Sequence, residues 1–383
     1  MTHQTERQRK ERDISDTLEA ISALPPRAGN MVGIGCYLKI KMGGKASVHI
    51  TILAHDGCMA SSIYNTIDFF KAASELHGRG KRAPFSKIEV ISVDGNRVIA
   101  HNKLVVQPDM ATHEVERADL VVVPGFSFFS LEIPDIPYKT LSFLRRMHQN
   151  GSILAAMCTG SFLLAEAGLL DGKVATTSWV VADIFEKRYP SVQLHRSRMV
   201  TDDSHILCSG SITAYLNMFL YIIEKYVSRE AMLFCSKAML IDPGKESQAP
   251  YMAFIPKRTH QDKTILMAQE YMETRFGTAL TIEEVARHVG LGLRQFRRRF
   301  KEATGESPIG YIQLIRIDHA KRLLEEGRLS LSEITWKVGY EDISSFRKLF
   351  KRATGIPPSR YRNQFHSPSF APKKSFAGQR ACG

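Results

Sequence analysis

The spacing of apolar residues changes along the chain. Up to about residue 240, short apolar runs such as Val48–Leu53 and Leu120–Val123 alternate with segments whose apolar residues recur every three or four positions, such as Ser62–Leu76. Short apolar runs predict buried strands, and the longer period predicts helices. Because helices cover both faces of a parallel sheet, this alternation predicts an α/β domain.

The same alternation continues to residue 226. Further strands are expected at Ser152–Met157, Val174–Thr177 and His205–Cys208. Further helices are expected at Ser161–Ala167, which Gly168 would end, at Val181–Tyr189 and at Thr213–Tyr226. The apolar face of the last helix predicts either core or a dimer surface, and it is formed by Leu216, Phe219, Leu220 and Ile223.

A duplication dominates the C-terminal part. The stretches FKEATGESPIGY (Phe300–Tyr311) and FKRATGIPPSRY (Phe350–Tyr361) are identical at seven of twelve positions and lie fifty residues apart. Duplication at a fixed offset defines an architectural unit. Upstream of each copy, Thr281 with Glu284 and Ser330 with Glu333 have the S/T-x-x-E spacing of a helix-opening capping box.

Glycines then break each of these helices. Gly290 and Gly339 follow the first helix of each copy, and apolar residues four apart indicate a second helix. A short helix, a glycine turn and a second helix form a helix-turn-helix unit. The sequence therefore predicts two such units, joined by a helix over Ile312–Glu326 that would span about 22 Å.

The outward faces of the second helices favour DNA binding over plain helical packing. Burying Phe296, Phe300, Phe346 and Phe350 turns a set of cationic and hydroxyl side chains toward solvent. These predicted DNA-binding residues are Arg294, Arg297, Arg298, Ser344, Ser345, Arg347 and Lys348. Arginine pairs with guanine edges and serine contacts several bases, and the linking helix could place the two faces near major grooves about 34 Å apart.

Residues 261–365 resemble the AraC-type DNA-binding domain. The resemblance rests on the two units, the linking helix and the A-T-G-x-x-P-x-x-Y signature at Ala353–Tyr361. It implies an all-α double helix-turn-helix domain, sequence-specific transcription regulation, and an attached domain that senses a ligand or dimerises. The implied partners are double-stranded promoter DNA, a small effector, a second copy of the chain and RNA polymerase.

Charge placement agrees with this division. The net charge is +13; residues 46–250 hold 20 Lys and Arg against 21 Asp and Glu, whereas residues 262–362 hold 19 against 13. A phosphate-binding surface requires this concentration of positive charge. The six cysteines have no paired spacing, which predicts no structural metal site. The charged start is no signal peptide, and no run is long enough to span a membrane, so we expect a cytoplasmic protein with reduced thiols.

A cysteine lies between a predicted strand and helix, in Ala155-Ala-Met-Cys158-Thr-Gly-Ser161. That is the geometry of a nucleophile elbow, in which backbone N–H groups lower a thiol pKa. With Pro124-Gly125 upstream and the segment Ala165–Trp179 downstream, residues 47–226 resemble the class I glutamine-amidotransferase-like superfamily of the PfpI type. The order of the two domains resembles the GlxA family of regulators. The resemblance implies a flavodoxin-like sandwich.

Two residues of the PfpI-type enzymes are replaced here. Their elbow-binding glutamate aligns with Ser62, and the histidine that follows Thr-Thr aligns with Ser178. A thiolate needs a base and a group that orients the base. Neither is visible near Cys158, and His195 or His205 could be invoked only by guesswork. We therefore expect no enzyme activity and no cofactor; a redox or covalent sensor, and a cysteine hydrolase or amidase fused to a DNA-binding domain, are the alternatives.

Small-molecule recognition is then the expected task of the α/β domain. Open α/β sheets bind ligands beyond the carboxyl ends of their strands. The expected pocket is formed by Gly125, Phe126, Cys158, Thr159, Ser178, Trp179 and Thr213. Aromatic residues there, among them Tyr215, could contact a cationic nitrogen, and GlxA-type regulators include sensors of arginine and of betaine-like amines.

Five segments are expected along the chain. A mobile extension (1–45), with one added strand near Cys36–Lys41, precedes the sensor domain (46–240). A linker (241–261), the DNA-binding domain (262–365) and a disordered tail (366–383) follow.

Overall fold

A computed structural model describes residues 48–77, 84–127 and 135–366 of the 383-residue chain. The expected N-terminal extension and its strand lie outside these residues, as does the expected tail from residue 367 onward.

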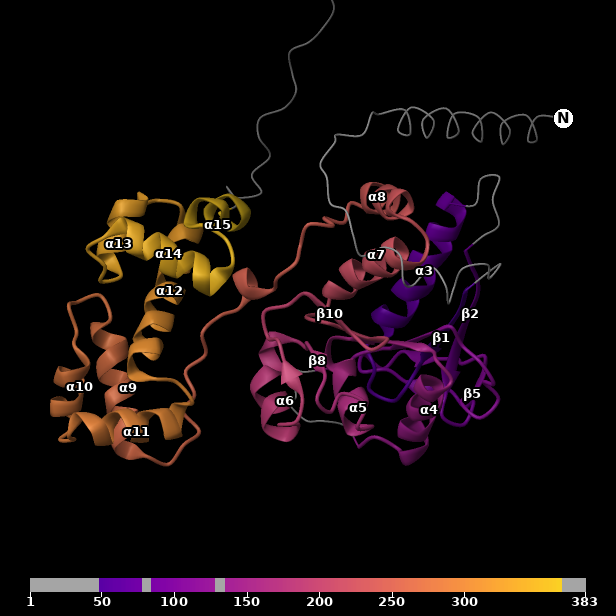
Figure 1. The fold of residues 1–383 in the computed structure, drawn as a ribbon, viewed down its shortest axis with the longest axis horizontal. Helices are drawn as coiled ribbons and strands as arrows, with labels where there is room; N and C mark the ends of the chain where they lie inside the picture. The colour runs from indigo at the N-terminus through magenta and orange to yellow at the C-terminus, as the bar shows by residue number, and fades with distance from the viewer. Residues whose placement is uncertain (1–47, 78–83, 128–134, 367–383) are drawn as a thin grey trace, which may run out of the picture. The chain divides into compact units, whose positions relative to one another are not determined.

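A seven-stranded sheet forms the centre of the α/β domain, in the order β10-β11-β7-β6-β1-β2-β5 (Figure 1). Neighbouring strands run parallel except the edge strand β10, which is antiparallel to β11. The strands are β1 (Val48–Leu53), β2 (Phe85–Ser92), β5 (Met110–Ala111), β6 (Leu120–Val123), β7 (Ile153–Met157), β10 (Val200–Asp203) and β11 (Ile206–Ser209). This confirms the predicted flavodoxin-like α/β sheet.

Two small sheets lie outside the main one. They pair β3 (Val98–Ile99) with β4 (Val105–Val106), and β8 (Val174–Ala175) with β9 (Gln193–Leu194). The strand expected at Val174–Thr177 therefore exists, but it is shorter and belongs to one of these small sheets.

Helices cover both faces of the main sheet (Figure 1). On one face lie α4 (Tyr138–Gln149), α5 (Ser161–Glu166) and α6 (Ala182–Arg188); on the other lie α3 (Ala60–His77) and α7 (Ala214–Tyr226), with α8 (Arg229–Ala238) against α7. Phe219, Leu220 and Ile223 of α7 are buried, and the ring of Phe219 lies 4.8 Å from that of Phe70 in α3. These α7 residues are therefore core.

The C-terminal domain consists of helices alone. They are α9 (Lys263–Arg275), α10 (Ile282–His288), α11 (Leu293–Thr304), α12 (Pro308–Glu326), α13 (Leu331–Lys337), α14 (Ile343–Thr354) and α15 (Pro358–Phe365). Two separate cores hold them together, and α12 contributes to both: Ile312 and Ile315 to the first, and Ile317, Ala320 and Leu324 to the second.

The duplicated A-T-G motif ends the second helix of each unit. Gly305 and Gly355 adopt φ of 85° and 77°, the left-handed conformation of a helix C-terminus. The hydroxyl groups of Thr304 and Thr354 are buried and donate to the carbonyl oxygens of Phe300 and Phe350, at 2.7 and 2.8 Å. The repeated motif thus forms the same helix end in both units.

The tyrosine that closes each copy has an equally matched role. Tyr311 donates to Glu273 and Tyr361 donates to Glu325, both at 2.6 Å, and each ring packs edge-on against the last phenylalanine of its own recognition helix. The signature that suggested two equal units therefore consists of structural residues.

Candidate nucleic-acid interface and cysteine elbow

Both units turn at a glycine with positive φ. Gly290 and Gly339 have φ of 66° and 80°, which side-chain-bearing residues rarely adopt. A Cβ at Gly339 would also lie 2.7 Å from the carbonyl oxygen of Phe276. The first helix of each unit opens with a complete capping box, Thr281 with Glu284 and Ser330 with Glu333, as the spacing predicted.

The second helices, α11 and α14, present matching surfaces. Phe296, Phe300, Phe346 and Phe350 are all fully buried. The seven side chains predicted to contact DNA are all exposed: Arg294, Arg297, Arg298, Ser344, Ser345, Arg347 and Lys348. Gln295 is exposed between them and was not singled out, although its amide can pair with adenine and the same helical phase would have indicated it. Contact with DNA by these residues stays a prediction.

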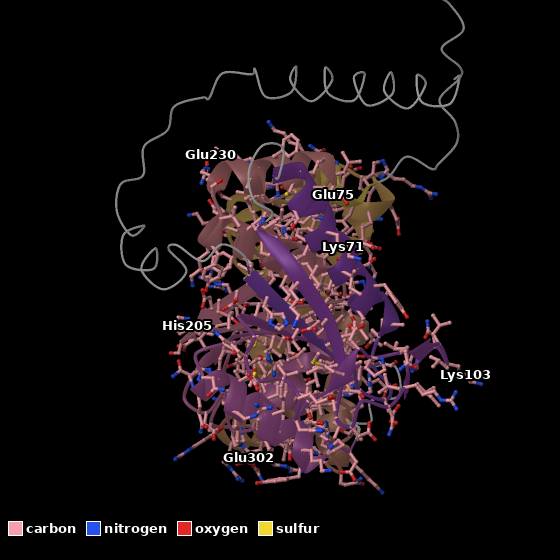
Figure 2. All side chains as sticks on the ribbon, turned by 90° about the vertical axis from the view of Figure 1, so that its right-hand side faces the viewer. Lys71, Glu75, Lys103, His205, Glu230 and Glu302 are labelled. Atoms are coloured by element: carbon pink, nitrogen blue, oxygen red, sulfur yellow. The ribbon has the colours of Figure 1, made fainter. Side chains whose placement is uncertain are left out.

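The exposed cations differ in their partners within the protein. Arg297 lies 3.6 Å from Glu283, and Arg298 lies 3.1 Å from Glu302, a surface carboxylate labelled in Figure 2. Among the described residues, Arg294, Arg347 and Lys348 form no ion pair. Exposed pairs are worth about 0–1 kcal/mol, so a phosphate could displace either glutamate.

One arginine of α11 belongs to the scaffold instead. Arg299 is only partly exposed and donates two hydrogen bonds to the carboxylate of Asp262, at 2.7 and 3.0 Å. The guanidinium group beside Asp262 lowers the pKa of that carboxyl. Asp262 also accepts from the backbone N–H of Ile265 and so caps α9. Arg299 therefore joins α11 to α9.

The helix between the units is longer than predicted. It begins at Pro308, capped by Ser307, rather than at Ile312, and its 19 residues span about 28 Å. Proline is favourable at the first position of a helix, because its missing N–H has no partner there.

The segment before α9 contacts both domains. Gln248 is 2% exposed, donates to the carbonyl oxygens of Thr177 (2.9 Å) and Arg196 (2.8 Å), and accepts from Ser211 (3.3 Å). The ammonium group of Lys321 in α12 donates to the carbonyl oxygen of Met252 at 2.6 Å. Residues 248–252 are therefore attached to the strand-following loops on one side and to α12 on the other.

Cys158 lies at the elbow where β7 passes into α5. Its φ is 54°, a left-handed conformation that is uncommon for a residue with a side chain and typical of a nucleophile elbow. Two residues further on, Gly160 lies so close to β6 that a Cβ there would be 2.4 Å from the carbonyl oxygen of Val123. The predicted elbow geometry is thus present.

The thiol at this elbow is not activated. Burial raises the pKa of Cys158 to about 11, and the hydrogen bonds from the Thr159 backbone and from the Ser178 and Thr159 hydroxyl groups offset this only in part. Reactive cysteines have a pKa well below 8.5. At neutral pH, Cys158 is therefore a thiol and not a thiolate.

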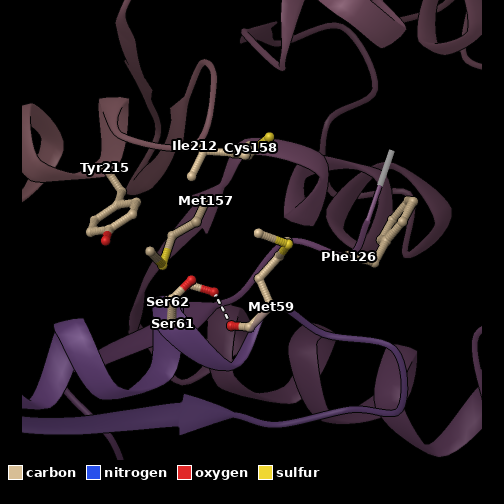
Figure 3. A pocket seen from close by; sticks show the side chains of 9 residues that line it. Met59, Ser61, Ser62, Phe126, Met157, Cys158, Ile212 and Tyr215 are labelled. Carbon is tan, nitrogen blue, oxygen red and sulfur yellow. Dashed lines mark hydrogen bonds between the residues drawn. The ribbon is translucent and has the colours of Figure 1, made fainter. Parts of the chain in front are cut away.

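A small, mainly apolar cavity lies beside Cys158 (Figure 3). It is lined by Met59, Ser61, Ser62, Gly125, Phe126, Met157, Cys158, Ile212 and Tyr215, and its volume is about 20 Å³. A cavity of that size holds about one water molecule. Of the seven expected pocket residues, Gly125, Phe126 and Cys158 line it; Thr159, Ser178, Trp179 and Thr213 do not. Ligand binding by that set stays a prediction.

Among the residues that the structure describes, no acid or base lines this cavity. Ser62, at the position of the enzymes' glutamate, donates to the carbonyl oxygen of Met59 at 2.5 Å, the dashed bond in Figure 3. Ser178 contacts Ser211. His205 precedes β11, at the opposite end of the strand from the elbow, because Ile206 pairs with Leu154 and Ser209 with Met157. It cannot act on Cys158.

Family models match both the α/β domain and the helical domain. The DJ-1/PfpI family model matches residues 50–225, and a helix-turn-helix domain model matches residues 285–364. The chain is thus similar to the DJ-1/PfpI family in its α/β domain and to helix-turn-helix domains in its helical domain. The DJ-1/PfpI domain holds the elbow, and the helix-turn-helix domain holds the two cationic faces.

Three curated relatives are named as HTH-type transcriptional regulators. The chain is 26% identical to the HTH-type transcriptional regulator CdhR of Pseudomonas aeruginosa, over 85% of this chain and 95% of that protein. It is 26% identical to the regulator GbdR of the same species, over 81% and 82%, and 29% identical to the regulator GlxA of Rhizobium meliloti, over 58% and 68%. No helix within the described residues is long and apolar enough to cross a membrane.

Proposed function

We propose that this protein is a DNA-binding transcriptional regulator whose DJ-1/PfpI domain binds a small effector without catalysing a reaction. The observation that carries the first half is the pair of matched helices, α11 and α14, whose outward faces hold exposed cations and hydroxyl groups. The relatives named as HTH-type transcriptional regulators support it. Binding of a second copy of the chain and of RNA polymerase stay predictions from the family resemblance.

The proposal that the DJ-1/PfpI domain catalyses no reaction is supported by the lining of the elbow cavity, where no described residue is an acid or a base. Nucleophilic catalysis by cysteine requires a thiolate and a general base. Here burial keeps the thiol protonated, and serines stand where the enzymes have glutamate and histidine. The attachment of residues 248–252 to both domains offers a physical route by which an effector could alter DNA binding.

Substitution of the elbow cysteine tests the non-enzymatic assignment. Cys158→Ser should bind DNA as the native protein does, and neither protein should turn over acyl or amide substrates. Turnover that the native protein shows and Cys158→Ser lacks would establish the alternative, a cysteine hydrolase fused to a DNA-binding domain.

The reactivity of the thiol provides an independent readout. Because burial raises its pKa to about 11, the thiolate fraction of Cys158 at pH 7 is small and grows about tenfold per pH unit up to that value. Alkylation by iodoacetamide, followed on the Cys158 peptide by mass spectrometry, should therefore be slow at pH 7 and rise steeply toward alkaline pH. A rate that levels off below pH 8 would show an activated cysteine.

A further inference from the structure

A second and much larger cavity opens elsewhere in the DJ-1/PfpI domain. Its volume is about 290 Å³, against about 20 Å³ beside Cys158. It lies beyond the carboxyl ends of β1 and β2, next to the start of α4. Its lining residues are Ala54, His55, Asp56, Ser92, Val93, Asp94, Asn96, Arg97, Val98, Asp135, Ile136, Pro137, Thr140 and Leu163. Open α/β sheets bind ligands beyond the carboxyl ends of their strands, and this volume accommodates a small metabolite.

The charges on its wall are unbalanced. Asp56, Asp94 and Asp135 contribute three carboxylates, and Arg97 contributes one guanidinium group. Hydrogen bonds from Asn96 lower the pKa of Asp94, which therefore stays ionised at neutral pH. Among the described residues none of these four charged groups forms an ion pair within the protein. A net charge of about −2 thus faces the cavity.

Histidine does not offset this charge. The imidazole of His55 lies between two carbonyl oxygens, that of Asp56 at 3.1 Å from Nδ1 and that of Pro124 at 3.2 Å from Nε2. Burial lowers the pKa of His55 and so favours the neutral ring, an effect that the two carbonyl oxygens oppose because each accepts a hydrogen bond. The cavity therefore presents carboxylates and apolar surface, the latter from Val98, Ile136 and Leu163.

A buried hydroxyl group without a partner also lines the cavity. Thr140 is 1% exposed, and its Oγ1 forms no hydrogen bond with the residues that the structure describes. An unsatisfied buried hydroxyl costs about 1–3 kcal/mol, so such groups in native proteins usually have a partner. A ligand with a hydrogen-bonding group would supply one.

We propose that this cavity, rather than the one beside Cys158, binds the effector, and that the effector is a small organic cation. The volume is too large for a single metal ion and excludes a macromolecule, and three carboxylates against one guanidinium group select positive charge. The inference rests on the proposed function for its role in regulation, whereas binding itself is measurable without DNA.

The test uses three ligands with the same four-carbon chain and different charge. These are 1,4-diaminobutane (+2), 1,4-butanediol (0) and succinate (−2), added to the full chain in thermal unfolding and calorimetric titration. A ligand that binds the folded state alone raises the melting temperature with concentration. We expect the diamine to raise it, and the diol and succinate to leave it unchanged at equal concentration.

Three variants locate the binding. Asp135→Asn removes a carboxylate that has no hydrogen bond to the described part of the chain, and it should weaken diamine binding about tenfold. Thr140→Val keeps the shape of the side chain and should also weaken binding, without lowering the melting temperature of the free protein. The matched control Asp68→Asn, which changes the net charge equally on exposed α3 outside the cavity, should bind the diamine as the native protein does.

Cys158→Ser distinguishes the two cavities and should leave diamine affinity unchanged. The proposal is overturned if the diamine produces no shift, if the three ligands act alike, or if binding depends on Cys158 and not on Asp135 and Thr140. DNA binding is measured on the same preparations: loss of the diamine effect with intact DNA binding would reject this inference alone, and failure to bind any DNA would reject the proposed function.

Discussion

The two helix-turn-helix units share a scaffold and differ in what they expose. Both recognition helices have twelve residues, bury phenylalanine at the fourth and eighth positions, and end at a Thr-Gly pair. At the exposed positions, however, α11 has Arg294, Gln295, Arg297 and Arg298, where α14 has Ser344, Ser345, Arg347 and Lys348. The two units therefore share their buried residues and differ in their exposed ones.

The N-terminal caps of α11 and α14 also differ. Helix α11 begins after Gly292, which has no capping side chain, whereas the carboxylate of Asp342 accepts from the backbone N–H groups of Ser344 and Ser345 in α14. The first residues of a recognition helix are the ones that reach base edges. An arginine and a glutamine therefore occupy that place in the first unit, and two short side chains beside a carboxylate occupy it in the second. We infer that the first unit contributes most of the affinity and specificity.

The largest effect should come from removing the guanidinium groups of α11. Arg294→Ala, Arg297→Ala and Arg298→Ala together should weaken specific DNA binding by about 3 kcal/mol or more, because a single base-reading arginine is worth about 1–3 kcal/mol. Electrophoretic mobility shifts on a selected operator measure the loss. An unchanged melting temperature is the control, since none of the three side chains is buried.

The equivalent change in α14 should be smaller. Alanine at Ser344, Ser345, Arg347 and Lys348 should cost about 2 kcal/mol, because two cations and two neutral hydrogen-bonding groups are lost. If this variant binds more weakly than the α11 variant, the inferred order of the two units is wrong.

Single substitutions should separate base contacts from phosphate contacts. Arg294→Ala should relax the preference at one base pair, because Arg294 lies in the first turn of α11. Arg298 lies further along the helix and pairs with Glu302. Arg298→Ala should therefore weaken binding to all DNA sequences alike, and it should reduce the slope of log affinity against log salt concentration by about one unit. Titrations at several salt concentrations on specific and scrambled DNA distinguish the two; identical behaviour of both variants would contradict this division.

Removing the capping boxes should have the smallest effect. It should lower the stability of the protein equally in the two units. Thr281→Ala and Ser330→Ala each remove the side chain that accepts from the third residue of the helix, which typically costs about 1 kcal/mol of stability. Denaturant unfolding of the full chain, followed by far-ultraviolet circular dichroism, measures both. A large difference between them would show that the scaffolds are less alike than their matching contacts indicate.

Where a residue's neighbours in the chain decide its environment, sequence reasoning predicted the structure well. Strands β1 and β6 are continuous apolar runs, and the structure has them at the predicted bounds. The phenylalanine period predicted which side chains of α11 and α14 are exposed. Strand β2 was missed because Lys87 and Glu89 interrupt its apolar character, and amphipathic α4 was missed although Leu141, Leu144 and Met147 give it a helical period.

Tertiary neighbours account for what could not be predicted. The role of Arg299 depends on Asp262, 37 residues away, and four arginines in the same short helix give no sign of which one is structural. The large cavity gathers residues 54–56, 92–98 and 135–140, which share no motif. The first two segments meet because β1 and β2 are adjacent in the sheet, and the third is the start of α4. The elbow was visible in the sequence because its residues are consecutive.

Selection of binding sites from random double-stranded DNA, followed by hydroxyl-radical footprinting, tests the central claim most directly. The native protein should select two elements about one helical turn apart, with protection of two successive major grooves. The α11 variant should lose one element and the α14 variant the other. A single protected groove, unaffected by the four substitutions in α14, would contradict a regulator that reads DNA with two units.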